Sequence, residues 1–159
     1  MPLEIERKFL VDLTLLELPA DGKLICQGYL PVDAGSKAVV RVRISGELAW
    51  LTIKGENAGA VRAEFEYPVP LADAKDMLRD LCDPPLIEKT RYDIRVDQHL
   101  WQVDVFHGDN QGLVVAEIEL ESADEAFGLP DWITAEVTHD PRYYNSNLRM
   151  HPFSRWGAP

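Results

Sequence analysis

The sequence lacks the features that would place a protein in or across a membrane. No apolar run approaches the roughly 20 residues that a membrane-spanning helix needs. The N-terminus also lacks the basic segment followed by an apolar segment that marks a secretory signal peptide. These absences predict a cytoplasmic protein with no membrane partner.

Cysteine is scarce, with Cys26 and Cys82 as its two occurrences. They do not form the short pair that is typical of metal-binding or redox motifs. The sequence therefore predicts free thiols in a reducing compartment, and a disulfide between the two is the alternative.

Positive charge is in deficit, because 16 Lys and Arg residues face 27 Asp and Glu residues, for a net charge of -11 at pH 7. Such a protein repels phosphate backbones and anionic lipids, so nucleic acid is not predicted as a partner. The placement of the bases is more informative than their number, since several occur in closely spaced alternating pairs.

The chain has 159 residues, of which 46% are hydrophobic and 27% charged. This composition suits one folded domain with a substantial core. No internal repeat, low-complexity segment or linker-like stretch divides the sequence. One domain over residues 1–159 is predicted.

Strand-like segments dominate the chain, and turn residues separate many of them. Ser45-Gly46-Glu47 and the stretch Gly55–Ala60 predict tight hairpins. The expected strands are Leu3–Val11, Cys26–Val32, Ala38–Ser45, Ala49–Lys54, Val61–Val69, Leu86–Val96, Leu100–Phe106, Leu113–Glu121 and Thr134–Val137. Three helices are expected over Leu71–Leu81, Ser122–Gly128 and Asp140–Met150. Hairpin-connected strands with few helices favour a mainly β (α+β) fold, a closed or nearly closed antiparallel barrel with the helices packed outside.

Charged side chains alternate with apolar ones along these strands, and charged neighbours on one face often share a sign. The like-charged pairs are Glu4/Glu6, Arg41/Arg43, Glu64/Glu66, Lys89/Arg91 and Glu117/Glu119. A sheet with one wet face also alternates, but an exposed surface usually mixes signs to limit repulsion. The preference for Arg suits bidentate contact with carboxylate or phosphate. The charged faces are predicted to line an enclosed space, and a solvent-facing sheet is the alternative.

A charged lumen needs ligands, because a buried charge without a partner is costly. With Lys8, Lys54, Arg62 and Asp104 added to the pairs, acids and bases in the lumen are equal in number. A polyanion on the basic strands, bridged to the carboxylates by divalent cations, would neutralise both sets. Oxygen ligands favour Mg²⁺ or Mn²⁺. The residues alone predict a metal-dependent site for a phosphate chain.

The stretch Glu4-Ile5-Glu6-Arg7-Lys8 resembles the EXEXK signature of the CYTH superfamily, the triphosphate tunnel metalloenzymes. Further family-like motifs follow in order: Arg41-Val42-Arg43, Thr52-Ile53-Lys54, Glu64-Phe65-Glu66, Lys89-Thr90-Arg91, Glu117-Ile118-Glu119 and the segment Val137–Leu148. The resemblance covers nearly the whole chain. It implies a closed eight-stranded antiparallel barrel, the triphosphate tunnel, which holds a triphosphate or triphosphate ester with a divalent metal.

The resemblance also implies a role for each matching residue. The phosphate oxygens would be bound by Arg41, Arg43, Lys54, Lys89 and Arg91. The metal would be held mainly by Glu4, Glu6, Glu117 and Glu119, with Glu64, Glu66 and Asp104 helping to hold metal, water or neighbouring cations. A homodimer is implied as well.

In short bacterial members resembling this chain, the lysine of the signature, here Lys8, is paired with a tyrosine that matches Tyr29. A neighbouring ammonium favours the phenolate, or the phenol exchanges a proton with a desolvated lysine. Either arrangement could activate the water that attacks a terminal phosphorus. The alternative is that Tyr29 caps the core while Lys8 only binds phosphate.

The first-choice function is metal-dependent hydrolysis of inorganic triphosphate to diphosphate and phosphate. The short connections between strands offer no evident surface for recognising a base or a thiazole. Three rivals stay open: a class IV adenylate cyclase, a thiamine triphosphatase, and a non-catalytic polyphosphate or nucleotide-binding protein.

Overall fold

The computed structural model describes residues 2–56 and 60–157, and these residues form nine strands, two α-helices and three short 3₁₀ turns. The strands are β1 (Leu3–Val11), β2 (Lys23–Tyr29), β3 (Val39–Ser45), β4 (Leu48–Lys54), β5 (Val61–Pro68), β6 (Asp83–Val96), β7 (His99–Phe106), β8 (Val114–Glu119) and β9 (Ile133–Glu136). The helical elements are α1 (Leu71–Asp80), α2 (Asn145–Leu148), η1 (Gly108–Asn110), η2 (Pro141–Tyr143) and η3 (Phe153–Arg155).

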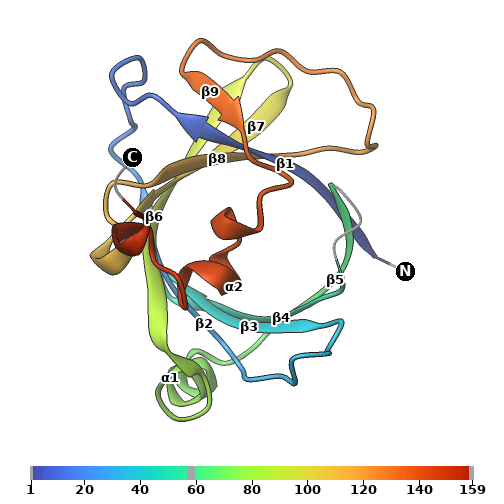
Figure 1. Ribbon diagram of the computed structural model, residues 1–159, viewed down its shortest axis with the longest axis vertical. Helices are drawn as coiled ribbons and strands as arrows, with labels where there is room; N and C mark the ends of the chain where they lie inside the picture. The colour runs from blue at the N-terminus through green and yellow to red at the C-terminus, as the bar shows by residue number, and fades with distance from the viewer. Residues whose placement is uncertain (1, 57–59, 158–159) are drawn as a thin grey trace.

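The sheet closes on itself through its first strand. Its order is β5-β4-β3-β2-β6-β7-β8-β1-β9, and β5 also pairs with β1. Strands β1 to β8 therefore form a closed antiparallel ring, which Figure 1 shows end-on. Along one edge of β1, residues 3–5 pair with β5, whereas Phe9 and Val11 pair with β9. The predicted eight-stranded barrel is confirmed, with β9 as an added strand.

The predicted tight hairpin between β3 and β4 is present. Strand β3 ends at Ser45 and β4 begins at Leu48. Gly46 between them has a φ of 63°, a conformation that glycine adopts without strain. The hairpin expected over residues 55–60 falls partly outside the described residues.

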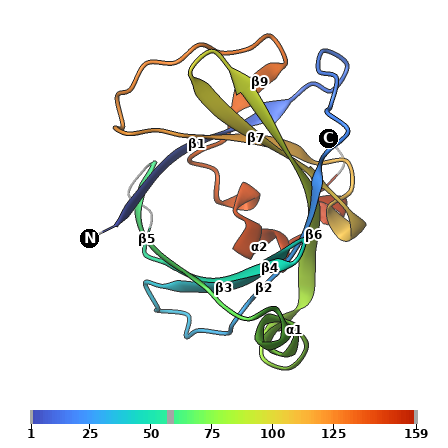
Figure 2. The same ribbon diagram turned by 180° about the vertical axis from the view of Figure 1, so that it is seen from behind.

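Helix α1 packs on the outside of the barrel against β2, β3 and β4 (Figures 1 and 2). Its buried residues are Ala74 and Leu78, which share a helix face and join a cluster with Val42 and Ala49 of the barrel wall. Asp73 in the first turn and Arg79 in the last turn complement the helix dipole. This helix matches the prediction.

The helix predicted over Ser122–Gly128 is wrong, since the segment forms turns and irregular chain. Ser122 Oγ donates to Asp124 Oδ1 at 2.9 Å, and a carboxylate oxygen of Glu125 accepts from the Glu121 backbone N–H at 2.7 Å. These local bonds satisfy polar groups without a helix. Phe127 then packs against Phe9 and Trp101, so the segment covers an outer apolar face of the barrel without forming a helix.

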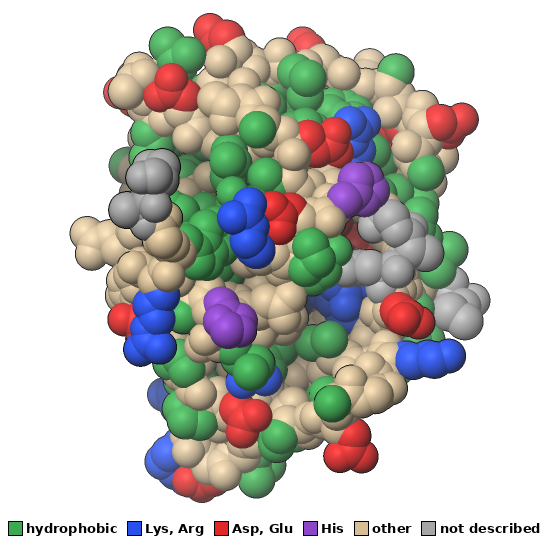
Figure 3. Space-filling model, viewed as in Figure 1, with side chains coloured by type: hydrophobic (Ala, Val, Ile, Leu, Met, Phe, Trp, Pro, Cys, Tyr) green, Lys and Arg blue, Asp and Glu red, His purple; other side chains and the backbone are tan. Residues whose placement is uncertain are grey.

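The helix predicted over Asp140–Met150 is shorter than expected and does not pack outside the barrel. The chain forms η2 and then the short helix α2, which lies over one opening of the ring (Figures 1 and 2). Tyr143 and Leu148 of this segment join a buried cluster with Phe106 and Val115. Figure 3 looks onto the same end, where hydrophobic side chains (green) and tan atoms, which include the backbone, cover much of the middle around a few charged or histidine side chains. The C-terminal segment therefore closes part of one end of the barrel.

Strand β2 runs three residues earlier than predicted, from Lys23 to Tyr29 rather than from Cys26 to Val32. Pro31 follows it and has no N–H to donate to a neighbouring strand.

In the described part of the chain, no helix has the length and apolar character needed to cross a membrane.

Candidate functional site

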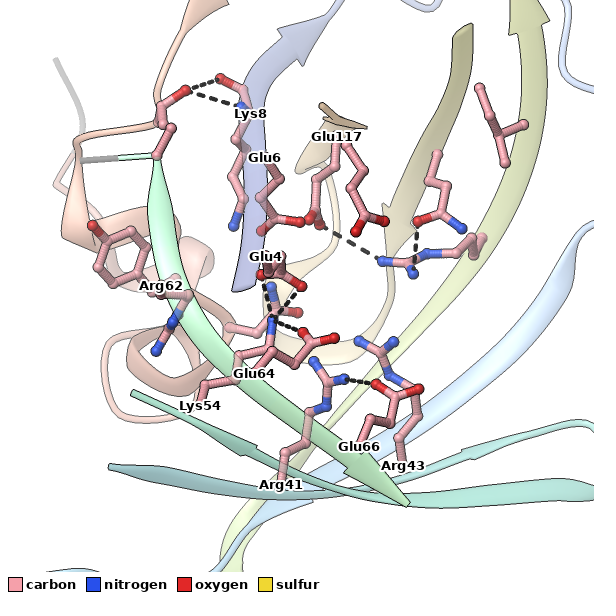
Figure 4. Close-up of a pocket in the computed structure, with 18 of the residues that line it drawn as sticks. Glu4, Glu6, Lys8, Arg41, Arg43, Lys54, Arg62, Glu64, Glu66 and Glu117 are labelled. Carbon is pink, nitrogen blue, oxygen red and sulfur yellow. Dashed lines mark hydrogen bonds and ion pairs between the residues drawn. The ribbon is translucent and has the colours of Figure 1, made fainter. Parts of the chain in front are cut away.

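A cavity of about 830 Å³ occupies the inside of the barrel. Its lining includes most of the residues that the sequence singled out: Glu4, Glu6, Lys8, Tyr29, Arg41, Arg43, Lys54, Glu64, Glu66, Lys89, Arg91, Glu117 and Glu119. Arg62 also lines it, whereas Asp104 does not. Figure 4 shows the labelled side chains pointing from the strands into this space. The structure thus brings together charged residues that lie far apart in the sequence.

The alternation of the strands explains which side chains point inward. Val42, between Arg41 and Arg43, is fully buried against α1 on the outside. Ile118, between Glu117 and Glu119, is fully buried in the outer cluster that contains Trp101. Because neighbouring residues in a strand face opposite sides, the apolar residues fix the charged ones on the inner face.

One side of the cavity is basic, and we call Arg41, Arg43, Lys89 and Arg91 the basic wall. They lie on β3 and β6, which both pair with β2. Burial and the neighbouring Arg41 and Arg91 lower the pKa of Arg43. Arg41 is 7% exposed, and within the described part of the chain its buried Nε has no hydrogen-bond partner. Crowded cations with an unused donor are suited to an anion.

Asp104 on β7 lies behind the basic wall rather than in the cavity. It is 1% exposed, and one carboxylate oxygen forms an ion pair with Lys89 Nζ at 2.7 Å. Both oxygens also accept from Arg91, at 2.7 Å and 2.8 Å. Burial alone would raise the pKa of Asp104, but these two cations lower it. Holding neighbouring cations is one of the roles expected for Asp104, and its oxygens contact two bases here. Its role as a metal ligand stays a prediction.

The opposite side of the cavity is acidic, and we call Glu4, Glu6, Glu64, Glu117 and Glu119 the acidic wall. They lie on β1, β5 and β8. Lys54 Nζ bridges two of them, at 3.0 Å from Glu4 and 3.3 Å from Glu64 (Figure 4). Arg91 Nη2 lies 3.6 Å from Glu117 and connects the two walls.

Two carboxylates of the acidic wall, Glu4 and Glu6, have raised pKa values. Burial and the neighbouring Glu64 raise the pKa of Glu4 to about 7, although Lys54 opposes the shift. Burial, Glu117 and Glu4 raise the pKa of Glu6 well above its usual value. Figure 4 shows the Glu6 carboxylate directed toward Glu117. The pKa of Glu117 is instead lowered despite burial by the charges of Lys8, Arg91 and Lys89, and that of Glu64 by its hydrogen bond with Glu4 and by Lys54. Like charges at close range cannot all ionise cheaply, so Glu4 and Glu6 are left without full compensation.

The donor set fits a hard divalent cation, although it forms no closed cage. The described residues contain no group of three or more His, Cys, Asp or Glu side chains arranged to hold a metal ion. Mg²⁺ commonly binds through one or two carboxylates and completes its shell with water and substrate phosphates. The carboxylate oxygens of the acidic wall, which face phosphate-binding bases across one cavity, suit that mode.

Lys8 and Tyr29 both line the cavity near the closed end. Lys8 Nζ donates to the backbone oxygen of Tyr143 at 3.1 Å and lies 5.8 Å from the Tyr144 ring centroid. Tyr29 is 5% exposed, its ring belongs to a core cluster, and its hydroxyl accepts from Gln27 Nε2 at 2.9 Å. No hydrogen bond joins Lys8 to Tyr29 among the described residues. The catalytic-pair interpretation and the core-capping alternative both remain compatible with this arrangement.

The sequence predicted no role for three polar residues of the barrel interior. Gln27 is fully buried, Thr52 is fully buried, and Asn145 of α2 lines the cavity. Gln27 and Thr52 share the inward face with Tyr29 and Lys54 through the period of two, so alternation could have found them. Asn145 carried no such signal, because its position depends on α2 lying over the barrel opening.

A smaller cavity of about 300 Å³ adjoins the first and shares Arg43, Glu66, Arg91 and Gln102 with it. Trp50 also lines this second cavity. The sequence predicted no surface for recognising a base, and Trp50 is an aromatic residue that lines this cavity. An aromatic ring at this place is relevant to whether the cavity accepts a triphosphate that carries a base.

Comparison with known proteins identifies one matching family and relatives that span nearly the whole chain. A family model described as the CYTH domain matches residues 2–144. A protein of Acetivibrio thermocellus named inorganic triphosphatase is 44% identical over 153 residues, covering 96% of this chain and 97% of that protein. A protein of the same name from Nitrosomonas europaea is 37% identical over 154 residues, covering 92% of this chain and 97% of that protein.

Solved structures agree with the sequence comparison. A crystal structure of an inorganic triphosphatase has a TM-score of 0.64 at 32% identity, covering 94% of this chain and 96% of that one. A structure from Bacillus halodurans has a TM-score of 0.60 at 21% identity, covering 77% of this chain and 84% of that one. At that identity the second likeness concerns the fold alone.

Proposed function

The chain belongs to the CYTH domain family, and on this premise we propose that it hydrolyses inorganic triphosphate to diphosphate and phosphate inside its barrel. Relatives covering nearly its full length carry the name inorganic triphosphatase. The observation that carries the proposal is the pairing of a basic wall with an acidic wall in one enclosed cavity.

The basic wall would bind the phosphate oxygens. Arg41 has a buried Nε without a partner in the described part of the chain, and a phosphate oxygen would satisfy it. Asp104 holds Lys89 and Arg91 in place before any substrate arrives, so little reorganisation is needed when charge develops in the transition state. Lys54 would add a contact from the acidic side, where it now bridges Glu4 and Glu64.

The acidic wall would hold the divalent metal, for which we propose Mg²⁺ or Mn²⁺. Glu4, Glu6, Glu117 and Glu119 are the expected main ligands, and Glu64 and Glu66 support them. When bound, the metal would supply positive charge to phosphate oxygens. The raised pKa of Glu4 and of Glu6 supports this assignment, because a cation would relieve the repulsion that now favours protonation.

We assign activation of the attacking water to Tyr29, with Lys8 supplying positive charge at the same end of the cavity. A positioned base lowers the activation barrier by taking the proton from the attacking water. Rigidly held phosphates lower it further, because the water and the phosphorus are already oriented for attack. Both residues line the cavity, which supports the assignment.

We further propose that the protein acts in the cytoplasm as a homodimer of one domain, residues 1–159. The family resemblance implies the dimer, and the net charge of -11 disfavours nucleic acid and anionic membranes as partners.

A substrate panel tests the function. Phosphate release is measured from inorganic triphosphate, ATP and thiamine triphosphate, each with Mg²⁺ and with Mn²⁺. We expect inorganic triphosphate to give the highest kcat/KM, with one diphosphate and one phosphate formed per turnover. Faster release from thiamine triphosphate would support a thiamine triphosphatase, and cyclic AMP formed from ATP would support an adenylate cyclase.

The panel also addresses a non-catalytic role. Tight binding of triphosphate without turnover under every metal condition would support a polyphosphate-binding protein instead. Trp50 offers a stacking surface beside the cavity, so Trp50→Ala is a useful companion variant. Loss of ATP turnover alone would show that the smaller cavity receives the base.

A further inference from the structure

Gln27 is a buried amide in the centre of the barrel wall that does not line the cavity. It lies on β2, two residues before Tyr29, so the two side chains share the inward face. Gln27 is 0% exposed, and Tyr29 lines the cavity where Gln27 does not. Any effect of Gln27 on the reaction must therefore pass through the residues that it contacts.

The orientation of the Gln27 amide follows from its contact with an arginine. Arg43 Nε donates to Gln27 Oε1 at 2.8 Å, and an arginine side chain has no acceptor. The amide oxygen must therefore face Arg43, and the amide nitrogen must face the other way. Gln27 Nε2 lies 2.9 Å from the Tyr29 hydroxyl oxygen, which accepts this hydrogen bond.

Asn145 accepts a second hydrogen bond from the same amide nitrogen of Gln27. Lys89 Nζ donates to Asn145 Oδ1 at 3.0 Å, which identifies that atom as the oxygen because lysine also has no acceptor. Gln27 Nε2 donates to the same oxygen at 3.3 Å. One buried amide thus connects Arg43 on β3, Lys89 on β6 and the Tyr29 hydroxyl.

We propose that Gln27 is a positioning residue that orients the Tyr29 hydroxyl for water activation and ties it to the phosphate-binding Arg43. Because the phenol oxygen accepts from Gln27, its own O–H is directed away from Gln27. A hydrogen bond donated to that oxygen also stabilises negative charge on it, and such a charge-assisted bond is stronger than a neutral one. The inference rests on the proposed hydrolysis, in which the Tyr29 phenol first releases its own proton to solvent and the phenolate oxygen then accepts a proton from the attacking water.

A purely structural Gln27 would behave differently. Its loss would then affect folding and the position of Arg43, but its effect on kcat would not depend on whether residue 29 carries a hydroxyl. The dependence of kcat on the Tyr29 hydroxyl is therefore the readout that separates the two roles.

The test is a double-mutant cycle with Gln27→Met and Tyr29→Phe, assayed for triphosphate hydrolysis with Mg²⁺. Methionine has a similar volume and makes no comparable hydrogen bond. We expect Gln27→Met to lower kcat about tenfold, the scale of one lost hydrogen bond. In the Tyr29→Phe background, the same change should lower kcat by less than about twofold, because the contact no longer exists.

Thr52→Val is the matched control. Thr52 is also fully buried and inward-facing, and its hydroxyl accepts from Arg41 Nη2 at 3.3 Å, so it contacts a base of the same wall without touching Tyr29. We expect it to raise KM for triphosphate and to leave kcat equally unaffected with Tyr29 and with Tyr29→Phe.

An equal loss of kcat in both backgrounds would overturn the proposal, and so would normal kcat in Gln27→Met. If Gln27→Met does not fold, Gln27→Glu takes its place, because its carboxylate still accepts from Arg43 but cannot donate to Tyr29. Normal turnover in Tyr29→Phe would refute this inference while leaving the proposed function intact. Absence of triphosphate hydrolysis in the unsubstituted protein would instead refute the proposed function.

Discussion

The two walls of the cavity differ in what lies against their charged side chains. On the basic wall, Lys89 and Arg91 share the buried carboxylate of Asp104, and Arg43 is held by the amide of Gln27. Burial nevertheless lowers the pKa of Lys89 to about 7 and that of Arg43 to about 9. On the acidic wall, burial and neighbouring carboxylates raise the pKa values of Glu4 and Glu6.

This difference indicates how each wall meets its ligand. The side chains of the basic wall are fixed by buried partners, so a polyanion finds its contacts already arranged. The acidic wall is internally repulsive and would gain from a bound cation. The protein is therefore expected to lose stability when the buried counter-charge of the basic wall is removed. It is expected to gain stability when a repelling carboxylate of the acidic wall is neutralised.

The largest effect is expected on the basic wall, from Asp104→Asn. This change leaves Lys89 and Arg91 without a buried counter-charge, and breaking a buried ion pair typically costs about 3–5 kcal/mol. The measurement is the free energy of unfolding by urea. KM for triphosphate should rise as well, because the two bases lose their fixed positions.

Asp93→Asn on the same sheet, in β6, provides the control, since Asp93 is exposed and should change stability by less than about 0.5 kcal/mol. If Asp104→Asn preserved stability and lowered only the apparent affinity for Mg²⁺, Asp104 would be a metal ligand after all. Its role as the buried partner of Lys89 and Arg91 would then be secondary.

The second effect concerns Tyr29, at the end of the cavity that α2 partly closes. We expect Tyr29→Phe to lower kcat about a hundredfold with little change in KM, because a general base contributes on that scale and the ring can still pack in the core. Steady-state kinetics with inorganic triphosphate provides the measurement. Near-normal turnover would remove Tyr29 as the base and favour its core-capping role.

A third effect, of opposite sign for stability, is expected from Glu6→Gln on the acidic wall. The raised pKa of Glu6 means that the metal-free protein loses stability as the pH rises above about 4.3, the value in an unfolded chain. Removing this charge should raise the melting temperature by about 2–4 °C at pH 8 with a chelator present. The Mg²⁺ concentration for half-maximal activity should rise about tenfold. A lower melting temperature would contradict the repulsion described for this wall.

The smallest effect is expected outside the cavity, at the ion pair between Arg7 and Glu136. Arg7 Nη2 lies 2.6 Å from Glu136 Oε1, and the hydrogen bonds from Arg7 lower the pKa of Glu136. A lowered pKa stabilises the fold above the unfolded value of about 4.3, and this contribution is lost as the pH falls through the folded value. Glu136→Gln should therefore cost about 0.5 kcal/mol at pH 7.

The difference in unfolding free energy between Glu136→Gln and the unsubstituted protein should shrink toward zero below about pH 4. A difference that is constant with pH would show that Glu136 acts through packing rather than charge. Because both side chains are partly exposed, the effect should also weaken at high salt.

The sequence predicted the cavity lining well because a strand has only two faces. Once Val42 and Ile118 are assigned to an outer apolar face, Arg41 and Glu117 must point inward. The same periodicity cannot tell a lining residue from one behind the lining. Asp104 shares the parity of the inward residues, yet Lys89 and Arg91 cover it.

Segments without a strand period were predicted less well. Ser122–Gly128 has the polar start of a helix, but its side chains bond locally and Phe127 is drawn to the aromatic cluster of the barrel wall. The position of α2 over the opening depends on contacts with residues more than a hundred positions away, such as Gln27 with Asn145. Such contacts leave no signature in a local pattern.

The most direct test of the two-wall account is phosphate release from inorganic triphosphate as Mg²⁺ is titrated from zero. We expect no turnover with a chelator present and saturable turnover as Mg²⁺ is added, because the acidic wall needs a cation before the reaction can proceed. Turnover that is equally fast without any divalent cation would contradict the account.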